Sequence, residues 1–353
     1  MSTARKTRTC TALVASALVA LTACGNDDGA TADTASSTAT APTSSALGTT
    51  ASTAATTPAT TAAPTTAPTS AVSASTIADD AAATRDLAYE RIVVSDQAIL
   101  DAALALGLPV AGIPGFADRQ TIPDYLVALA DGVEVLPDRT DLNFEQLAAF
   151  DPDLLLINPK TLDEVGGPEL LQEIAEVAEV DVVTTRPWRD SLRDVGAAVG
   201  RAESAEHRIA DTDAKIEAAR SALTSEQLAT EVSVIRCFGD SCRYLPGGTS
   251  FSGQVLDELG VTRPDLQASD AEGRAFVEVS PERVDLLDGD LILLFGTDAD
   301  DSLAALQSNP LWNQLEAVQN DRVVMVDPAP WFTGNVLAVE YIVDDIVSIL
   351  GAG

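Results

Sequence analysis

Residues 143–156 read Asn-Phe-Glu-Gln-Leu-Ala-Ala-Phe-Asp-Pro-Asp-Leu-Leu-Leu, and residues 280–293 repeat the pattern as Ser-Pro-Glu-Arg-Val-Asp-Leu-Leu-Asp-Gly-Asp-Leu-Ile-Leu. Each stretch begins with a residue that favours a helix N-cap, Asn143 or Ser280. A glutamate follows two positions later, and eight residues after it an aspartate opens an apolar run typical of a buried strand. The equal spacing predicts the same helix–strand unit in both halves of the chain.

The two glutamates of this repeat are Glu145 and Glu282. A single glutamate in the first turn of a helix is explained by its favourable interaction with the helix dipole. Two copies at matched positions instead favour a shared role on one face of the molecule.

Outward from these units, short apolar runs alternate with amphipathic segments from about residue 83 onward. Continuous apolar runs alternating with helices predict an α/β fold with parallel sheets. Residues 189–223 contain no proline and predict one long helix between two similar halves. The expected strands are residues 91–94, 109–113, 153–157, 181–184, 231–238, 276–279, 290–295 and 322–326. The expected helices are residues 96–106, 122–130, 143–150, 168–178, 189–223, 250–260, 281–287, 302–318 and 335–350.

The composition excludes several classes of function. With 54 acidic residues against 21 Lys and Arg, the net charge is −33, which disfavours binding to nucleic acid. The chain has 353 residues, enough for about two domains, and 46% of them are hydrophobic. One histidine, His207, falls within the predicted long helix and argues against His-rich metal sites and histidine-dependent catalysis. A binding protein is favoured over an enzyme.

The N-terminus has the pattern of an export signal. Arg5, Lys6 and Arg8 precede a short apolar stretch that ends at Leu21-Thr22-Ala23-Cys24, a sequence similar to the bacterial lipobox. This stretch is shorter than the roughly 20 residues that a membrane-spanning helix needs. We expect cleavage after residue 23 and a lipid on Cys24, with the competing interpretation that the signal is an ordinary one. From Thr34 to Ala78 there is no charged residue, and the Ala, Thr, Ser and Pro content predicts a disordered tether.

The chain from about Ala88 to its end resembles the class III substrate-binding proteins of ABC importers, in the group that includes ferric siderophore and cobalamin receptors. The resemblance rests on the order and spacing of several motifs, namely Arg91-Ile-Val-Val, Glu145 to Leu156, the long helix, Ser280-Pro-Glu282, Asn309-Pro310-Leu311 with Trp312, and Arg322-Val-Val-Met-Val-Asp.

This resemblance implies two Rossmann-like lobes with central parallel sheets, joined by one long rigid helix, with the ligand in a cleft between the lobes. It implies a monomer that is not an enzyme and that docks on an ABC permease dimer through Glu145 and Glu282. The expected segments are a signal peptide (1–23), a lipidated linker (24–82), an N-terminal lobe (83–188), a linking helix (189–225) and a C-terminal lobe (226–353). The chain is then held by its lipid on the outer face of a bacterial cell membrane.

A preformed metal chelate needs cations and aromatic rings from the protein rather than metal ligands. We therefore expect a ferric siderophore as the ligand, with no cofactor and no protein-bound metal. The expected contacts from the C-terminal lobe are Arg236, Arg243, Tyr244, Trp331 and Phe332, and those from the N-terminal lobe are Phe116, Trp188 and Arg189. A surface hairpin is the competing interpretation for Arg243 and Tyr244, and core packing is the one for Trp331. Arg119, Asn158, Lys160 and Arg186 are weaker candidates at loop positions.

Cys237 and Cys242 are close enough in sequence to form a disulfide in an exported protein, and two free buried thiols are the alternative. Other functions stay open at this point. Haem or cobalamin suits the same fold. Two alternatives belong to a different class of function. One is a wall hydrolase that uses paired carboxylates such as Glu272 and Glu278, and the other is a surface sensor or adhesion protein.

Overall fold

The computed structural model describes residues 65–66, 88–116, 120–138, 144–238, 241–268, 271–296 and 299–352. The signal segment, Cys24, Arg119 and Asn143 lie outside these residues. Of the residues expected in the disordered tether, Thr65–Thr66 form a two-residue strand, β1. Among the helices of the described part, none combines the length and the apolar character needed to cross a membrane.

The N-terminal lobe is built on a five-stranded sheet in the order β4-β3-β2-β5-β6, and all its pairings are parallel. Its central strands are continuous apolar runs that are buried on both sides, as expected of a sheet covered by helices. The strands are β2 (Ile92–Val94), β3 (Val110–Gly115), β4 (Glu134–Asp138), β5 (Leu154–Ile157) and β6 (Glu176–Glu179). The helices of this part are α2 (Gln97–Ala105), α3 (Asp124–Val127), α4 (Phe144–Phe150), α5 (Pro159–Glu164) and η2 (Leu171–Glu173).

The C-terminal lobe has a six-stranded sheet in the order β1-β11-β10-β7-β8-β9. It is mixed rather than wholly parallel, because β8 pairs antiparallel with both β7 and β9. The strands besides β1 are β7 (Val232–Phe238), β8 (Ser241–Tyr244), β9 (Val277–Val279), β10 (Leu291–Phe295) and β11 (Val323–Met325). The helices are α8 (Ser225–Leu228), α9 (Phe251–Leu259), η3 (Ala271–Gly273), η4 (Pro281–Leu287), α10 (Ala299–Ser308), η5 (Trp312–Gln314), α11 (Glu316–Gln319), α12 (Pro328–Phe332) and α13 (Val336–Gly351).

The repeated sequence unit forms a helix followed by a buried strand in both lobes, with the α-helix α4 in the first and the 3-10 helix η4 in the second. Asp153 opens β5 and accepts the backbone N–H groups of Glu90 and Arg91, just before the neighbouring strand β2. Asp290 opens β10 and accepts the backbone N–H of Glu231, just before the neighbouring strand β7. In both lobes this aspartate therefore ties the start of its own strand to the start of the adjacent parallel strand.

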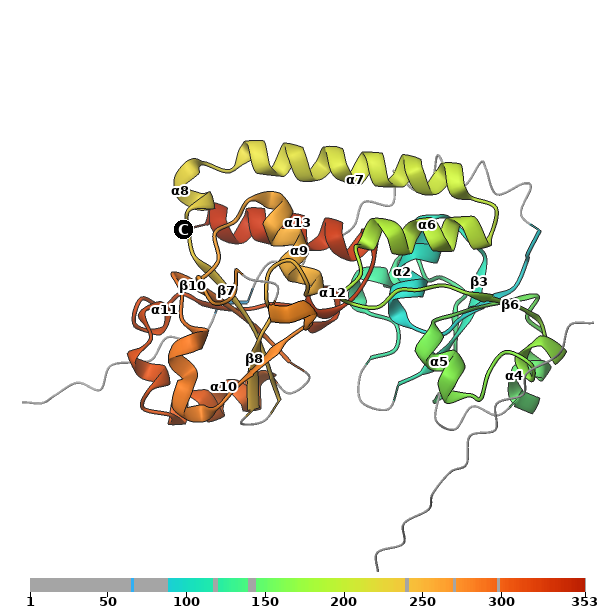
Figure 1. Cartoon of the computed structure of the whole chain (residues 1–353), viewed down its shortest axis with the longest axis horizontal. Coiled ribbons are helices and arrows are strands. Elements are labelled where there is room, and N and C mark those ends of the chain that lie inside the picture. Colours follow the sequence, from blue (N-terminus) through green and yellow to red (C-terminus); the bar gives the residue numbers. More distant parts are fainter. Residues whose placement is uncertain are drawn as a thin grey trace, which may run out of the picture. The chain divides into compact units, whose positions relative to one another are not determined.

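The segment expected to be one linking helix is two helices, α6 (Trp188–Ala198) and α7 (Ala202–Ala222). The break lies at Gly200, which has φ +69°, a conformation that glycine adopts without steric cost. The backbone N–H of Arg201 returns to the carbonyl of Gly196, which closes the turn. The chain therefore reverses direction, and α7 alone runs along the upper side of both lobes (Figure 1).

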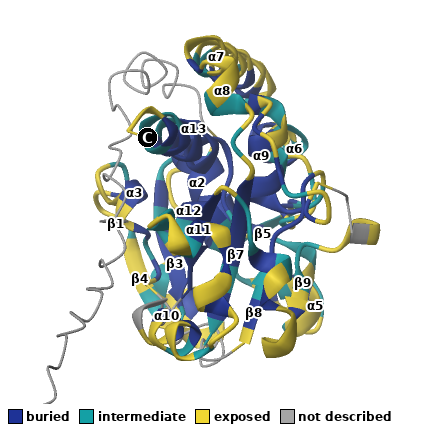
Figure 2. Cartoon of the chain, turned by 90° about the vertical axis from the view of Figure 1, so that its left-hand side faces the viewer, coloured by how far each residue is buried: buried dark blue, intermediate teal, exposed yellow. Residues whose placement is uncertain are grey.

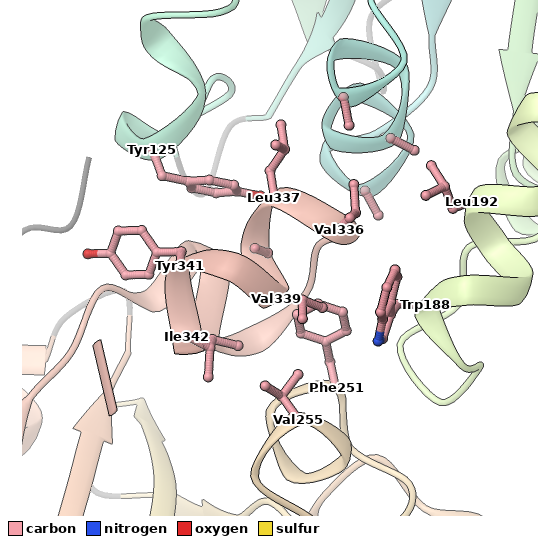
Figure 3. Close-up of a cluster of buried hydrophobic side chains, with 14 of the residues drawn as sticks. Tyr125, Trp188, Leu192, Phe251, Val255, Val336, Leu337, Val339, Tyr341 and Ile342 are labelled. Carbon is pink, nitrogen blue, oxygen red and sulfur yellow. The ribbon is translucent and has the colours of Figure 1, made fainter. Parts of the chain in front are cut away.

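A shared core joins the lobes around α13. One cluster of buried apolar side chains includes residues of β2 and α2, of α6 and α7, and of β7, β10 and α9. Figure 2 shows α13 and α2 as a continuous buried region, and Figure 3 shows side chains from α3, α6 and α9 gathered around the first half of α13. Tyr125 and Tyr341 contact one another there, with ring centroids 5.9 Å apart.

Besides the linking helix, three other expected elements differ in the structure. The helix expected at residues 168–178 is the short η2 followed by the edge strand β6, and residues 181–184 form no strand. The long helix expected at 302–318 is interrupted around Asn309 and Pro310, because proline lacks the N–H that a helix interior requires. The strands β4 and β8 and the helices α5 and α12 were not expected.

Candidate ligand-binding site

A row of cationic and aromatic side chains lies on one side of β7, β8 and β9. Successive residues of a strand point to opposite faces, so alternate positions share an environment. Ile235, Cys237, Cys242, Tyr244 and Val279 are buried in the core of the C-terminal lobe. The alternate residues Arg236, Phe238, Arg243, Phe276 and Glu278 therefore lie on the opposite face.

The disulfide between Cys237 and Cys242 joins β7 to β8 directly across the pair, with a Cα–Cα distance of 4.2 Å. Both cysteines are on the buried face of the hairpin. The predicted bridge is therefore present, and it fixes the register in which Arg236 faces Arg243.

Arg236 lies against two aromatic rings. Its guanidinium carbon is 4.2 Å from the ring centroid of Phe238 and 3.6 Å from that of Phe332. Phe332 comes from α12, the helix that follows β11, so the contact links this helix to β7 of the same sheet. A guanidinium group stacked on rings keeps its planar N–H groups oriented for recognition of oxygen atoms.

A pocket of about 240 Å³ lies beside this pair and is lined from both lobes. The C-terminal lobe contributes Arg236, Asp327, Phe332 and Thr333, together with Pro328 and Ala329. The N-terminal lobe contributes Gln97, Gln120, Pro123 and Asp124. The described lining thus combines one guanidinium group, two carboxylates, two amides and an aromatic face.

The lining side chains are held by specific bonds. Gln97, in the first turn of α2, is buried and donates to the carbonyls of Gln120 and Thr121 at 2.6 and 3.0 Å. Asp327 caps α12 by accepting the backbone N–H of Ala329 at 2.9 Å, and burial raises the pKa of Asp327 above its ordinary value. Both sides of the pocket are therefore ordered before any ligand arrives.

The structure brings two of the predicted ligand contacts, Arg236 and Phe332, to this pocket. Phe116 is half-buried nearby, with its N–H donated to Thr121, but does not line the pocket. Arg243 lies on the neighbouring strand β8, on the same face of the sheet as Arg236, and does not line the pocket. Its guanidinium group contacts the ring of Phe276 and forms an ion pair with Glu278 at 3.3 Å.

Four predicted contacts are elsewhere. Tyr244 is buried in the core of the C-terminal lobe because it neighbours Arg243 on a strand and so points to the opposite face. Trp331 is fully buried and donates its indole N–H to Asp345 at 2.9 Å. Trp188 is buried against α13 (Figure 3), and Arg189 forms ion pairs with Asp213 and Glu258 that tie α6 to α7 and α9.

The weaker candidates are also engaged in structural contacts. Asn158 caps α5 and donates to Asp96, Arg186 pairs with Asp181 and Asp194, and Lys160 pairs with Glu164 on the surface. The polar residues of the lining that were not predicted from sequence as ligand contacts are Gln97, Gln120, Asp124, Asp327 and Thr333. Only Asp327 had a signal, because it comes directly after the apolar run that ends at Val326.

Glu145 and Glu282 are both exposed and both in the first turn of their helices, α4 and η4. The second helix is of the 3-10 type, and the side chain of Ser280 makes no capping bond. Neither glutamate lines the pocket. Within the described residues, no group of three or more His, Cys, Asp or Glu side chains is placed to hold a metal ion.

This architecture, two sheets with a pocket between two lobes, has counterparts among known proteins. Residues 92–330 match the sequence family described as periplasmic binding protein. The chain belongs to that family. Family members are solute-binding proteins, and the two-lobed α/β fold with its pocket agrees with this membership.

The relatives of this binding protein cover most of its folded part. A Bacillus subtilis protein named "Probable siderophore-binding lipoprotein YfiY" is 29% identical over 269 residues, which cover 73% of this chain and 81% of the relative. The achromobactin-binding periplasmic protein of Dickeya dadantii is 25% identical over 271 residues, 74% of this chain and 87% of that protein. The structure of Staphylococcus aureus SirA complexed with staphyloferrin B has a TM-score of 0.63 at 22% identity, covering 74% of this chain and 93% of that one.

Proposed function

We propose that this protein captures a ferric siderophore outside the cytoplasm and delivers it to the permease of an ABC importer, without catalysing a reaction. The observation that carries the proposal is the pocket lined by both lobes, with Arg236 stacked on Phe332 at its wall. Relatives named for siderophore, achromobactin and ferric anguibactin binding support the same ligand class.

The chemistry of the lining suits a chelate better than a bare ion. A siderophore surrounds its iron with oxygen atoms and presents them, with an organic backbone, to the protein. The guanidinium group of Arg236 donates N–H groups to such oxygens, and the ring of Phe332 covers apolar surface. The N–H groups of Gln97 are already bonded to the carbonyls of residues 120 and 121, so its side chain can offer a carbonyl oxygen as acceptor. The amide of Gln120 donates one N–H to Asp124 and can still donate or accept, which suits mixed polar groups on the chelate.

Anchoring and docking complete the proposal. Lipid attachment at Cys24 and the tether of residues 24–82 would keep a monomeric receptor at the outer face of the membrane. Glu145 and Glu282, exposed at equivalent positions in the two lobes, would meet basic residues of the permease dimer. Neither glutamate lines the pocket, so docking and ligand capture would use different residues.

The test is a titration of the purified full-length chain with ferric hydroxamate, catecholate and carboxylate siderophores, each paired with its iron-free form. Haem and cobalamin are titrated in parallel. We expect one ferric siderophore class to bind more tightly than its iron-free form and more tightly than haem or cobalamin. Tight binding of haem or cobalamin, with no binding of any ferric siderophore, would overturn the proposal.

Variants of two arginines locate the site in the same titration. Arg236→Ala is expected to weaken binding about ten- to a hundredfold, because a charge-assisted contact contributes about 1.5–3 kcal/mol. Arg236→Lys keeps the charge but loses the planar fork, so it should recover part of the affinity. The control is Arg193→Ala, which removes a partly exposed arginine of α6 that pairs with Glu206 outside the pocket. Equal affinity of Arg236→Ala and Arg193→Ala would place the site elsewhere.

A further inference from the structure

Two arginines of the C-terminal lobe face each other across an antiparallel strand pair. Arg236 of β7 is directly opposite Arg243 of β8, and Arg243 is in turn opposite Glu278 of β9. Like charges directly opposite on neighbouring strands destabilise a sheet. The repulsion between Arg236 and Arg243 is therefore expected to be offset by other contacts of the two side chains.

Phenylalanine rings provide such contacts. In order from the pocket, the side chains are Phe332, Arg236, Phe238, Arg243 and Phe276. The successive distances between guanidinium carbon and ring centroid are 3.6, 4.2, 5.3 and 4.2 Å. All four are within the ~6 Å over which a ring face attracts a cation. We call these five side chains the aromatic–guanidinium stack.

The stack has an inner and an outer part. Phe332 and Arg236 line the pocket, whereas Phe238, Arg243 and Phe276 do not. The side chain of Arg243 is only 18% exposed, and its Nε atom is buried without a hydrogen-bond partner in the described part of the chain. Its ion-pair partner Glu278 is 69% exposed, so water screens that pair. Contact with the rings of Phe238 and Phe276 is therefore a large part of what holds Arg243.

We propose that Phe238, Arg243 and Phe276 are positioning residues, which set the affinity for the ligand by fixing the orientation of the Arg236 guanidinium group. The inference rests on the proposed function and adds a second layer to its site. An arginine side chain loses rotamer freedom when it binds, and a side chain ordered in advance loses less. The ring of Phe238 contacts both guanidinium groups, so the orientation of Arg243 restricts the orientation of Arg236 through this ring.

A double-mutant cycle tests the proposal. The ferric chelates of a trihydroxamate, a tricatecholate and a polycarboxylate siderophore are titrated against Phe276→Leu, Phe276→Tyr and Arg243→Met. Each substitution is made in the wild-type chain and in the Arg236→Ala chain, and thermal unfolding is recorded for every variant. Glu278→Gln is the matched control, because it alters the ion pair of Arg243 and leaves all three rings in place.

With Arg236 present, Phe276→Leu and Arg243→Met should each weaken chelate binding about two- to fivefold, the equivalent of one cation–π contact. Phe276→Tyr keeps a ring face and should recover most of the affinity, and Glu278→Gln should change it little. In the Arg236→Ala background neither Phe276→Leu nor Arg243→Met should weaken binding further.

An equal loss with and without Arg236 would overturn the proposal, because the outer residues would then contact the ligand themselves or act through general destabilisation. No loss in either background would overturn it as well. Failure of the wild-type chain to bind any of the three chelates would count against the proposed function instead. If Phe276→Leu fails to fold, Arg243→Met provides the same comparison.

Discussion

The carboxylate of Asp101 in α2 accepts the backbone N–H of Asn335 at 3.0 Å, although 234 residues separate the two. The same carboxylate accepts the N–H groups of Leu337 and Ala338 at 2.9 Å and the hydroxyl of Tyr125 at 3.0 Å. It thereby caps the N-terminus of α13 from a helix of the other lobe. Asp101 therefore connects α2 of the N-terminal lobe to α13 of the C-terminal lobe.

Replacing Asp101 should change how stability depends on pH. Burial raises the pKa of Asp101 from 3.8 to about 6, although its hydrogen bonds oppose that shift. The folded state therefore binds this proton more tightly than the unfolded state, and the stability gained is complete below pH 4 and lost as the pH rises through 6. The difference between a pKa of 3.8 in the unfolded state and about 6 in the folded state corresponds to about 3 kcal/mol of unfolding free energy.

In the wild type, this group alone should lower the free energy of unfolding between pH 4 and 6.5, whereas in Asp101→Asn that contribution is absent. Urea unfolding of both proteins at several pH values gives the difference. Asp345, whose pKa burial also raises to about 6, is present in both and cancels. Parallel pH profiles for the two proteins would contradict the assignment.

A second prediction concerns the helix that bridges the lobes. Arg208 of α7 and Glu340 of α13 form a buried ion pair at 2.7 Å, and Thr212 donates to the same carboxylate. Glu340→Ala leaves the buried guanidinium group without its charge partner, which should cost about 3–5 kcal/mol. Asp344→Ala removes the partner of Lys215 between the same two helices. The side chains of this pair are 33% and 41% exposed, so water screens the pair and its loss should cost less, about 1 kcal/mol. Chemical denaturation measures both, and equal losses would show that burial does not govern these pairs.

The buried strands could be predicted from sequence because each is a continuous apolar run beside a turn signal. Leu154–Ile157 and Leu291–Phe295 are of this kind, and both are central in their sheets. The edge strand β6 reads Glu-Val-Ala-Glu and has two exposed glutamates, so its composition does not distinguish it from a surface helix. The break between α6 and α7 depends on the backbone at Gly200, which periodicity over a proline-free stretch does not reveal.

The candidate site could be predicted in part for a similar reason. Arg236 lies near the C-terminal end of β7, and Phe332 lies in the helix that follows β11 of the same sheet, a region where side chains converge in parallel sheets. Tyr244 was misplaced because β8 was not expected as a strand, and the strand imposes alternation on residues 241–244. The N-terminal half of the pocket depends on Gln97 holding residues 120–121, a contact across the fold that no local pattern encodes.

A third prediction tests the anchor. If Cys24 receives the lipid, Cys24→Ala in cells should leave the chain unprocessed or release it into the medium, because the thiol that carries the lipid is gone. Fractionation of membranes and medium, followed by a size comparison, measures both outcomes. Cys10→Ala is the matched control, because Cys10 lies within the signal segment of residues 1–23 and its loss should leave processing and attachment at Cys24 unchanged. Normal processing and membrane attachment of Cys24→Ala would rule out the lipobox.

The last prediction separates docking from ligand capture. Glu145 and Glu282 are exposed in the first turns of α4 and η4, and neither lines the pocket. The double variant Glu145→Ala, Glu282→Ala should therefore abolish uptake of radiolabelled ferric chelate by cells while the affinity of the purified protein for the chelate stays within about twofold. The control pair, Glu203→Ala with Glu217→Ala, removes two exposed glutamates from α7, on the opposite side from α4 in Figure 1, and should leave uptake intact. A large loss of affinity in a stably folded double variant would instead place these glutamates in the ligand site, and equal uptake by the two double variants would exclude them from permease docking.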